Sequence, residues 1–124
     1  MFAPILKTIN TPAVQAIMGT GRPRIYSSGN APQGVVTPYI TWFVVVGQPY
    51  EQLSGPPGAD NDAIQIDCWA GPDSDQEIVC INLAKAVRDA LDEAGQANRI
   101  IFNNRESDTK LFRVALQVDF IHNR

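Results

Sequence analysis

Few side chains in this sequence have the types and spacing that catalysis or metal binding requires. His122 is the single histidine and the third residue from the end, which favours a plain surface position over a role as general base. Cys68 and Cys80 each lie within an apolar pattern, which predicts two buried free thiols; a disulfide or a metal pair is the alternative. A zinc site needs about four ligands, so these residues would have to recruit carboxylates. We therefore expect no metal site.

Carboxylate pairs are the next candidates for chemistry. Asp60 and Asp62 resemble the first ligands of a calcium-binding loop, but no glutamate follows at the position that closes such a loop. Asp67 and Asp119 both fall on the polar sides of predicted strands and would be neighbours if those strands pair. Two such carboxylates serve as acid and base only where burial separates their pKa values.

Nucleophile and phosphate-binding motifs are also absent from the sequence. Ser27 and Ser28 are not preceded by the glycine that a nucleophile elbow needs. Gly19 and Gly21 belong to a segment that is too short for a phosphate loop and lacks the lysine and helix that should follow. We predict that the chain is not an enzyme and holds no cofactor.

Composition predicts a single folded domain over residues 1–124. Hydrophobic residues make up 44% of the chain and charged residues 19%, as is usual for a globular protein. The net charge is −3, and the basic residues are scattered, which argues against tight binding to nucleic acid. The N-terminus lacks a secretory pattern, and the longest apolar run, residues 42–46, is far too short to span a bilayer. We expect a soluble protein without membrane contact.

The N-terminal part is predicted to hold two short helices followed by two strands. One helical segment ends before Asn10, and Thr11 caps a second that has Pro12 at its first position; one kinked helix is the alternative. Residues 24–26 are a short strand. Residues 38–46 form the strongest strand, and its apolar character on both sides predicts a central strand covered by helices or by a neighbouring subunit.

A long connection over residues 47–61 is predicted to follow this strand. It is either a mobile surface loop or an arm that becomes ordered against a partner. Its candidate interface residues are Tyr50, Glu51, Gln52 and Leu53. A strand with alternating apolar and polar residues comes next, over residues 63–70.

The C-terminal half is predicted to form a helix and then a hairpin. Ser74 and Glu77 match a capping box, and the helix runs from there to Gly95. Residues 99–103 and 111–121 pair as antiparallel strands around a polar turn. The turn supplies further candidate interface residues: Arg105, Glu106, Asp108 and Lys110. Together these elements predict an α+β domain, with an antiparallel sheet of four to five strands and the helices packed on one face.

The order and spacing of these segments resemble the tail completion, or tail terminator, proteins of long-tailed bacteriophages. The matching segments are residues 2–5, 24–26, 31–34, 38–42, 64–69, 90–91 and 114–120. The resemblance implies a structural virion protein that forms a homohexameric ring on the head-proximal end of the tail tube, ends tube polymerisation and offers a surface for head–tail joining. Its partners would be copies of itself, the tail tube protein and head–tail connector proteins, after synthesis in the cytoplasm of the host bacterium.

The resemblance also implies a role for the charge of the chain. DNA would pass through the lumen of the ring as cargo, and scattered negative charge would keep its phosphates from sticking. The alternative interpretation is a small ligand-binding or enzymatic α+β domain that uses a pocket against the sheet.

Overall fold

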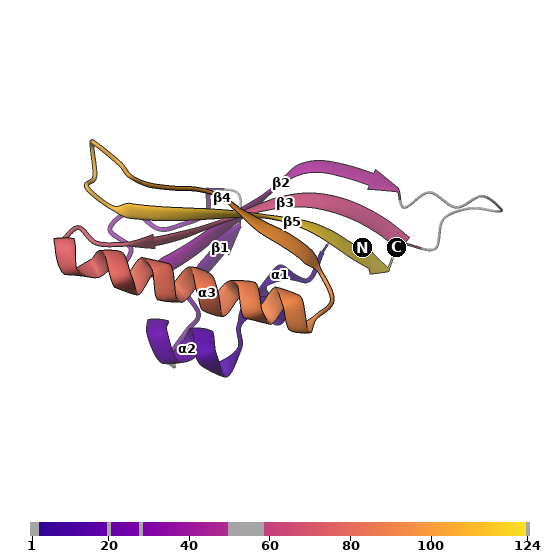
Figure 1. Ribbon diagram of the computed structural model, residues 1–124, viewed down its shortest axis with the longest axis horizontal. Helices are drawn as coiled ribbons and strands as arrows, with labels where there is room; N and C mark the ends of the chain where they lie inside the picture. Colours follow the sequence, from indigo (N-terminus) through magenta and orange to yellow (C-terminus); the bar gives the residue numbers. More distant parts are fainter. Residues whose placement is uncertain (1–2, 20, 28, 50–58, 124) are drawn as a thin grey trace.

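The computed structural model describes residues 3–19, 21–27, 29–49 and 59–123 of the chain, as helices on one side of a sheet (Figure 1). The helices are α1 (Ile5–Ile9), α2 (Pro12–Met18) and α3 (Glu77–Glu93), with a short 3-10 helix over Ser74–Gln76. The strands are β1 (Ile25–Ser27), β2 (Tyr39–Pro49), β3 (Ala59–Ala70), β4 (Ala97–Arg105) and β5 (Phe112–Asn123). Within the described ranges, no helix combines the length and apolar character needed to cross a membrane.

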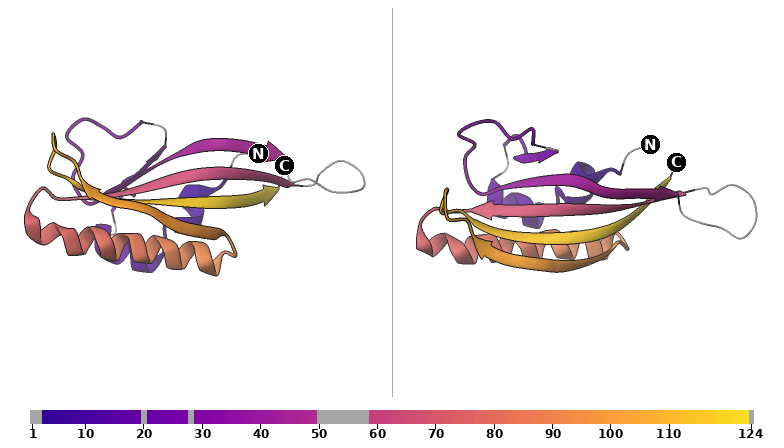
Figure 2. Two further views of the ribbon diagram at one scale, coloured as in Figure 1. Left: turned by 45° about the horizontal axis from the view of Figure 1, so that its top comes forward. Right: turned by 90° about the horizontal axis from the view of Figure 1, so that it is seen from above.

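The five strands form one sheet in the order β1-β2-β3-β5-β4, which Figure 2 shows from above. The predicted α+β class and strand number are confirmed. The sheet is mostly antiparallel, as predicted, with one exception: β1 pairs with β2 in parallel, while the other three pairs of described strands are antiparallel. The chain returns along the sheet after β1 before it enters β2, so both strands run in the same direction.

The core lies between the sheet and the helices, which cover one face as predicted (Figures 1 and 2). Alternation along β3 and β5 turns every second side chain toward α3, whose own apolar residues recur at helical spacing. The fully buried side chains of this layer include Ile64, Ile66, Cys68, Leu83, Val87, Leu91, Leu116 and Val118. Burial of these side chains holds the sheet against α3, and the opposite face carries the alternate residues.

The N-terminal segment forms two helices, and the kinked single helix is excluded. The side-chain oxygen of Thr11 accepts a hydrogen bond from the backbone N–H of Val14 at 3.4 Å, and Pro12 occupies the first helical position. Gly19 ends α2 with a φ of 102°, a value that suits glycine.

The predicted cap of α3 is confirmed at its C-terminal end and wrong at its N-terminal end. The capping box is wrong: a 3-10 turn begins after Asp73, no side chain caps it, and the α-helix starts at Glu77. The predicted cap at Gly95 is confirmed. Its φ is 76°, and the bonds Gly95 N–H to Asp92 O and Gln96 N–H to Leu91 O form a Schellman motif.

The connection between β2 and β3 is shorter than predicted. Three residues at each end of the expected segment, 47–49 and 59–61, belong to the paired strands. They pair because β2 and β3 continue their antiparallel ladder past a bulge between Val44 and Val46. The remaining residues, with Tyr50, Glu51, Gln52 and Leu53 among them, lie outside the part of the chain that the structure describes.

Candidate functional site

The face of the sheet opposite the helices carries an ion pair between a buried carboxylate and a partly buried arginine. Asp67 is only 3% exposed although it lies on this outer face. Arg113, on the neighbouring strand β5, donates from Nη2 to Asp67 Oδ2 at 3.1 Å, and the side-chain amide of Gln65 donates to Oδ1 at 2.9 Å. The pairing of Trp69 with Arg113 in the β3–β5 ladder places the guanidinium diagonally beside Asp67.

Aromatic rings surround that arginine and extend the arrangement across the sheet. The Arg113 guanidinium carbon lies 5.0 Å from the Trp69 ring centroid and 4.7 Å from that of Phe102. Trp69 stacks on Tyr39 with 5.9 Å between centroids and donates from Nε1 to the Thr41 hydroxyl at 3.0 Å. We call Tyr39, Trp69, Arg113 and Phe102 the aromatic–arginine row; it crosses β2, β3, β5 and β4 in turn.

The row is a rigid surface suited to contacts rather than to chemistry. Cation–π contacts and stacking restrain each side chain, so little rotamer freedom remains to be lost when a partner covers it. Arg113 Nε is buried without an acceptor among the described residues. The sequence does not reveal the row, because a bulge after Ile100 sets the position of Phe102.

The predicted carboxylate pair is not formed. Strands β3 and β5 do pair, but Asp67 lies opposite Ala115 and Asp119 lies opposite Ala63. The Gln65–Gln117 pair therefore separates the two carboxylates, and Asp67 is neutralised by Arg113. This register does not bring the two acids together as a pair.

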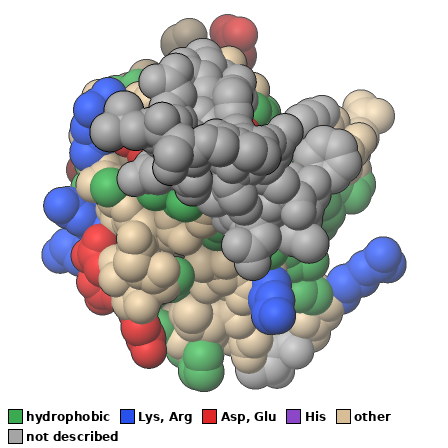
Figure 3. All heavy atoms as spheres, turned by 90° about the vertical axis from the view of Figure 1, so that its right-hand side faces the viewer, with side chains coloured by type: hydrophobic (Ala, Val, Ile, Leu, Met, Phe, Trp, Pro, Cys, Tyr) green, Lys and Arg blue, Asp and Glu red, His purple; other side chains and the backbone are tan. Residues whose placement is uncertain are grey.

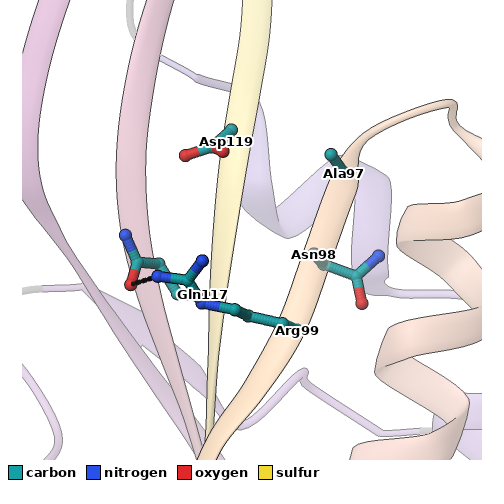
Figure 4. A pocket seen from close by; sticks show the side chains of 5 residues that line it. All are labelled: Ala97, Asn98, Arg99, Gln117 and Asp119. Atoms are coloured by element: carbon teal, nitrogen blue, oxygen red, sulfur yellow. Dashed lines mark hydrogen bonds between the residues drawn. The ribbon is translucent and has the colours of Figure 1, made fainter.

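A shallow depression at the β4–β5 end of the face is lined by Ala97, Asn98, Arg99, Gln117 and Asp119 (Figure 4). Its volume is about 120 Å³, and Arg99 donates from Nη2 to Gln117 Oε1 at 3.2 Å across it. A wider groove of about 500 Å³ runs between α1, α2 and α3 and carries Lys7 and Glu93. Neither brings together the convergent ionisable groups that mark a catalytic pocket.

Both cysteines are free and buried, as predicted, and they do not form a disulfide. The Cys80 thiol donates to the backbone oxygen of Cys68 at 3.1 Å. Burial raises the pKa of Cys80 to about 11 and that of Cys68 well above its usual value, so both remain protonated and unreactive at neutral pH. Among the described residues, no cluster of histidine, cysteine and acidic side chains could hold a metal; the His122 side chain lies outside that set.

The predicted interface residues of the polar turn lie on an ordered hairpin between β4 and β5. Arg105 donates to the backbone oxygens of Pro72 at 2.7 Å and Lys110 at 3.0 Å. Glu106 accepts from Thr109 at 3.4 Å, and Asp108 is exposed at the tip. The turn lies at the end of the sheet opposite the end where β2 leads into residues 50–58 (Figure 1). Its role as an interface stays a prediction.

Charge is mixed over the end of the molecule where β2 and β3 meet their connection. Figure 3 shows Lys and Arg side chains interspersed with Asp and Glu side chains around the described part of this view, with apolar side chains between them. The described residues in this view therefore form no patch of one charge sign.

One comparison with known proteins identifies a family, and another identifies a shared fold. The family model described as "Tail completion protein gp17" matches residues 7–123 of the chain. No curated protein matches it. A chain in a solved structure, "Virion of native gene transfer agent (GTA) particle", shares the fold with a TM-score of 0.65 and 14% sequence identity, over 95% of this chain and 92% of that one.

Proposed function

The chain belongs to the tail completion protein gp17 family, and from this premise we propose that it closes the head-proximal end of a phage tail. Membership makes it a structural protein of the phage tail. The proposed role is a homohexameric ring that seats on the finished tail tube, stops its polymerisation and presents the opposite side to head–tail connector proteins.

The observation that carries this proposal is the extent of the family match. Residues 7–123 include α2, α3, the last part of α1 and all five described strands, so the match extends over nearly the whole described fold rather than one motif. The likeness to a chain of the gene transfer agent virion supports the same fold. A protein of this kind acts by contact, and the restrained side chains of the aromatic–arginine row suit such contacts.

A terminator also needs two different contact surfaces. The tube-facing surface must be complementary to an open tube end. The opposite surface must differ from an open tube end, because otherwise further tube protein would bind there and the tube would keep growing. The turn at residues 106–111 lies at one end of the sheet, and at the other end β2 leads into residues 50–58, which the structure does not describe. We assign one of these to the tube protein and the other to the connector.

DNA is proposed to pass through the ring without binding. The net charge is −3, and acidic and basic side chains are mixed where the surface is seen in Figure 3. Neutralisation of several phosphates by clustered Lys and Arg would be needed to retain DNA. Purified protein should therefore leave the mobility of duplex DNA unchanged at physiological ionic strength.

The proposal is tested in a phage that lacks this gene. We expect tails of uncontrolled length without attached heads, and restoration of both features by the wild-type gene on a plasmid. Labelled protein should appear at the head-proximal tail end by electron microscopy. Tails of normal length that lack heads would limit the role to joining, and infectious particles of normal form would overturn the proposal.

A further inference from the structure

The sheet has two edges that are open within the described residues. Strand β1 covers β2 only at Ile40, Thr41 and Trp42. Residues 43–49, apart from the bulged Val45, therefore pair with β3 on one side and with no described strand on the other. At the far edge, β4 pairs only with β5 among the described strands. Open edges present unpaired backbone N–H and C=O groups, which a further strand satisfies.

Both edges expose apolar side chains at a bulge. On β2, Phe43 and Val44 are exposed and Val45 is 49% exposed; on β4, Ile100 is exposed and Ile101 is 36% exposed. Val45 and Ile101 are the extra residues of the two bulges, since neither has a cross-strand partner in its own chain. Natural edges are usually protected by charges, yet β2 carries none along its whole length. The pattern indicates edges that are covered in the assembled protein.

We propose that the open edge of β2 in one copy pairs with β4 of the next copy, so that the sheets of neighbouring copies join into one. This inference deepens the proposed function and rests on its ring. The occupant is a second copy because one chain supplies both halves of the contact: residues 43–49 and the nine residues of β4 are of similar length.

The charges of the two edges are compatible with this contact. Arg99 and Arg105 of β4 donate to acceptors of their own chain, Gln117 Oε1 and the backbone oxygens of Pro72 and Lys110. The facing segment of β2 carries no charge, and no acidic residue lies in β4. Because the edges lie on opposite sides of one sheet, each copy offers one to each neighbour. Such a head-to-tail contact makes a ring when its rotation closes.

The test places a lysine on each edge in turn. Val45→Lys and Ile101→Lys change exposed side chains, so each variant should fold, with a urea unfolding curve near that of the wild type. Each should sediment as a single chain under conditions where the wild type forms a ring, and neither should be cross-linked into rings on tail tubes. Ile78→Lys is the matched control, because Ile78 is 57% exposed on α3, and it should keep the ring.

Mixing the two variants gives the sharpest readout. Val45→Lys retains an intact β4 edge and Ile101→Lys an intact β2 edge, so one junction can form and the mixture should give a dimer of one chain of each variant.

Rings that persist in both edge variants would overturn the edge contact while leaving the tail-closing role intact. Loss of assembly in Val45→Lys alone would indicate β2–β2 pairing and also overturn it. A wild type that forms no ring in solution or on tubes would overturn the proposed function itself.

Discussion

Asp67 organises the side chains on the face of the sheet opposite the helices, which we call the helix-free face. A carboxylate removed from water is costly unless charge and hydrogen bonds compensate it, and here Arg113 and Gln65 do so. The same arginine is held between Trp69 and Phe102. One ion pair thus connects strands β3 and β5 and orients the aromatic–arginine row.

Removing that carboxylate should destabilise the fold. Asp67→Ala leaves the partly buried Arg113 without its partner, and we expect the free energy of unfolding to fall by about 2–3 kcal/mol. Urea unfolding followed by circular dichroism measures the change. Asp119→Ala is the matched control, because Asp119 is exposed on the same face, and should change stability by less than about 0.5 kcal/mol. Equal effects of the two changes would contradict a special role for Asp67.

The Cys80 thiol should make stability fall at alkaline pH. Burial raises its pKa from 9.0 to about 11, so the unfolded thiol ionises first. The stabilisation is fully present below about pH 9 and is lost as the pH rises toward 11, with a slope of up to about 1.4 kcal/mol per pH unit. Cys80→Ala should have a shallower slope over this range in urea unfolding. The pKa values of Cys68 and Tyr39 are also raised, so these two residues contribute to the decrease of unfolding free energy with pH in both the wild type and Cys80→Ala. Identical slopes would contradict the assignment to Cys80.

At the scale of elements, α3 has stronger capping interactions at its C-terminal end than at its N-terminal end. The Schellman bonds around Gly95 satisfy backbone groups that would otherwise be left without partners, whereas no side chain caps the N-terminal side. The turn after Gly95 also sets where β4 begins, and so where the open edge lies.

Gly95→Ala should therefore weaken the helix end. The φ of 76° disfavours any residue with a Cβ, although that atom would meet nothing within 4 Å. We expect a loss of about 1 kcal/mol, seen as a lower thermal midpoint in circular dichroism. Gly21→Ala is the control, since its Cβ would also meet nothing and its φ is not positive; it should have little effect. An unchanged midpoint in Gly95→Ala would show that the backbone there adapts freely.

For the whole molecule, the proposed edge contact predicts how the ring responds to salt. Backbone hydrogen bonds and aliphatic side chains form the contact, and charge pairs contribute little. The ring should keep its mass in analytical ultracentrifugation from about 0.01 M to 1 M sodium chloride, over which the Debye length falls from about 30 Å to 3 Å. Dissociation at high salt would show that ion pairs hold the copies together, in conflict with the neutral β2 edge.

The sequence by itself determined most of the helices and strands and the buried stripe of α3, β3 and β5. These follow from residues close together in the chain: Thr11 and Pro12 start α2, Gly95 ends α3, and alternation along residues 112–120 turns one face of β5 inward. The family resemblance drawn from the order of segments was also confirmed.

Tertiary structure alone decided how those elements meet. The parallel pairing of β1, the ion pair between Asp67 and Arg113, and the extent to which β1 leaves β2 uncovered all depend on register between distant segments. Residues 67 and 113 are 46 positions apart, and no local periodicity links them. Register is set when the apolar faces are buried together against α3, so the helix-free face and its open edges appear only once the sheet is assembled.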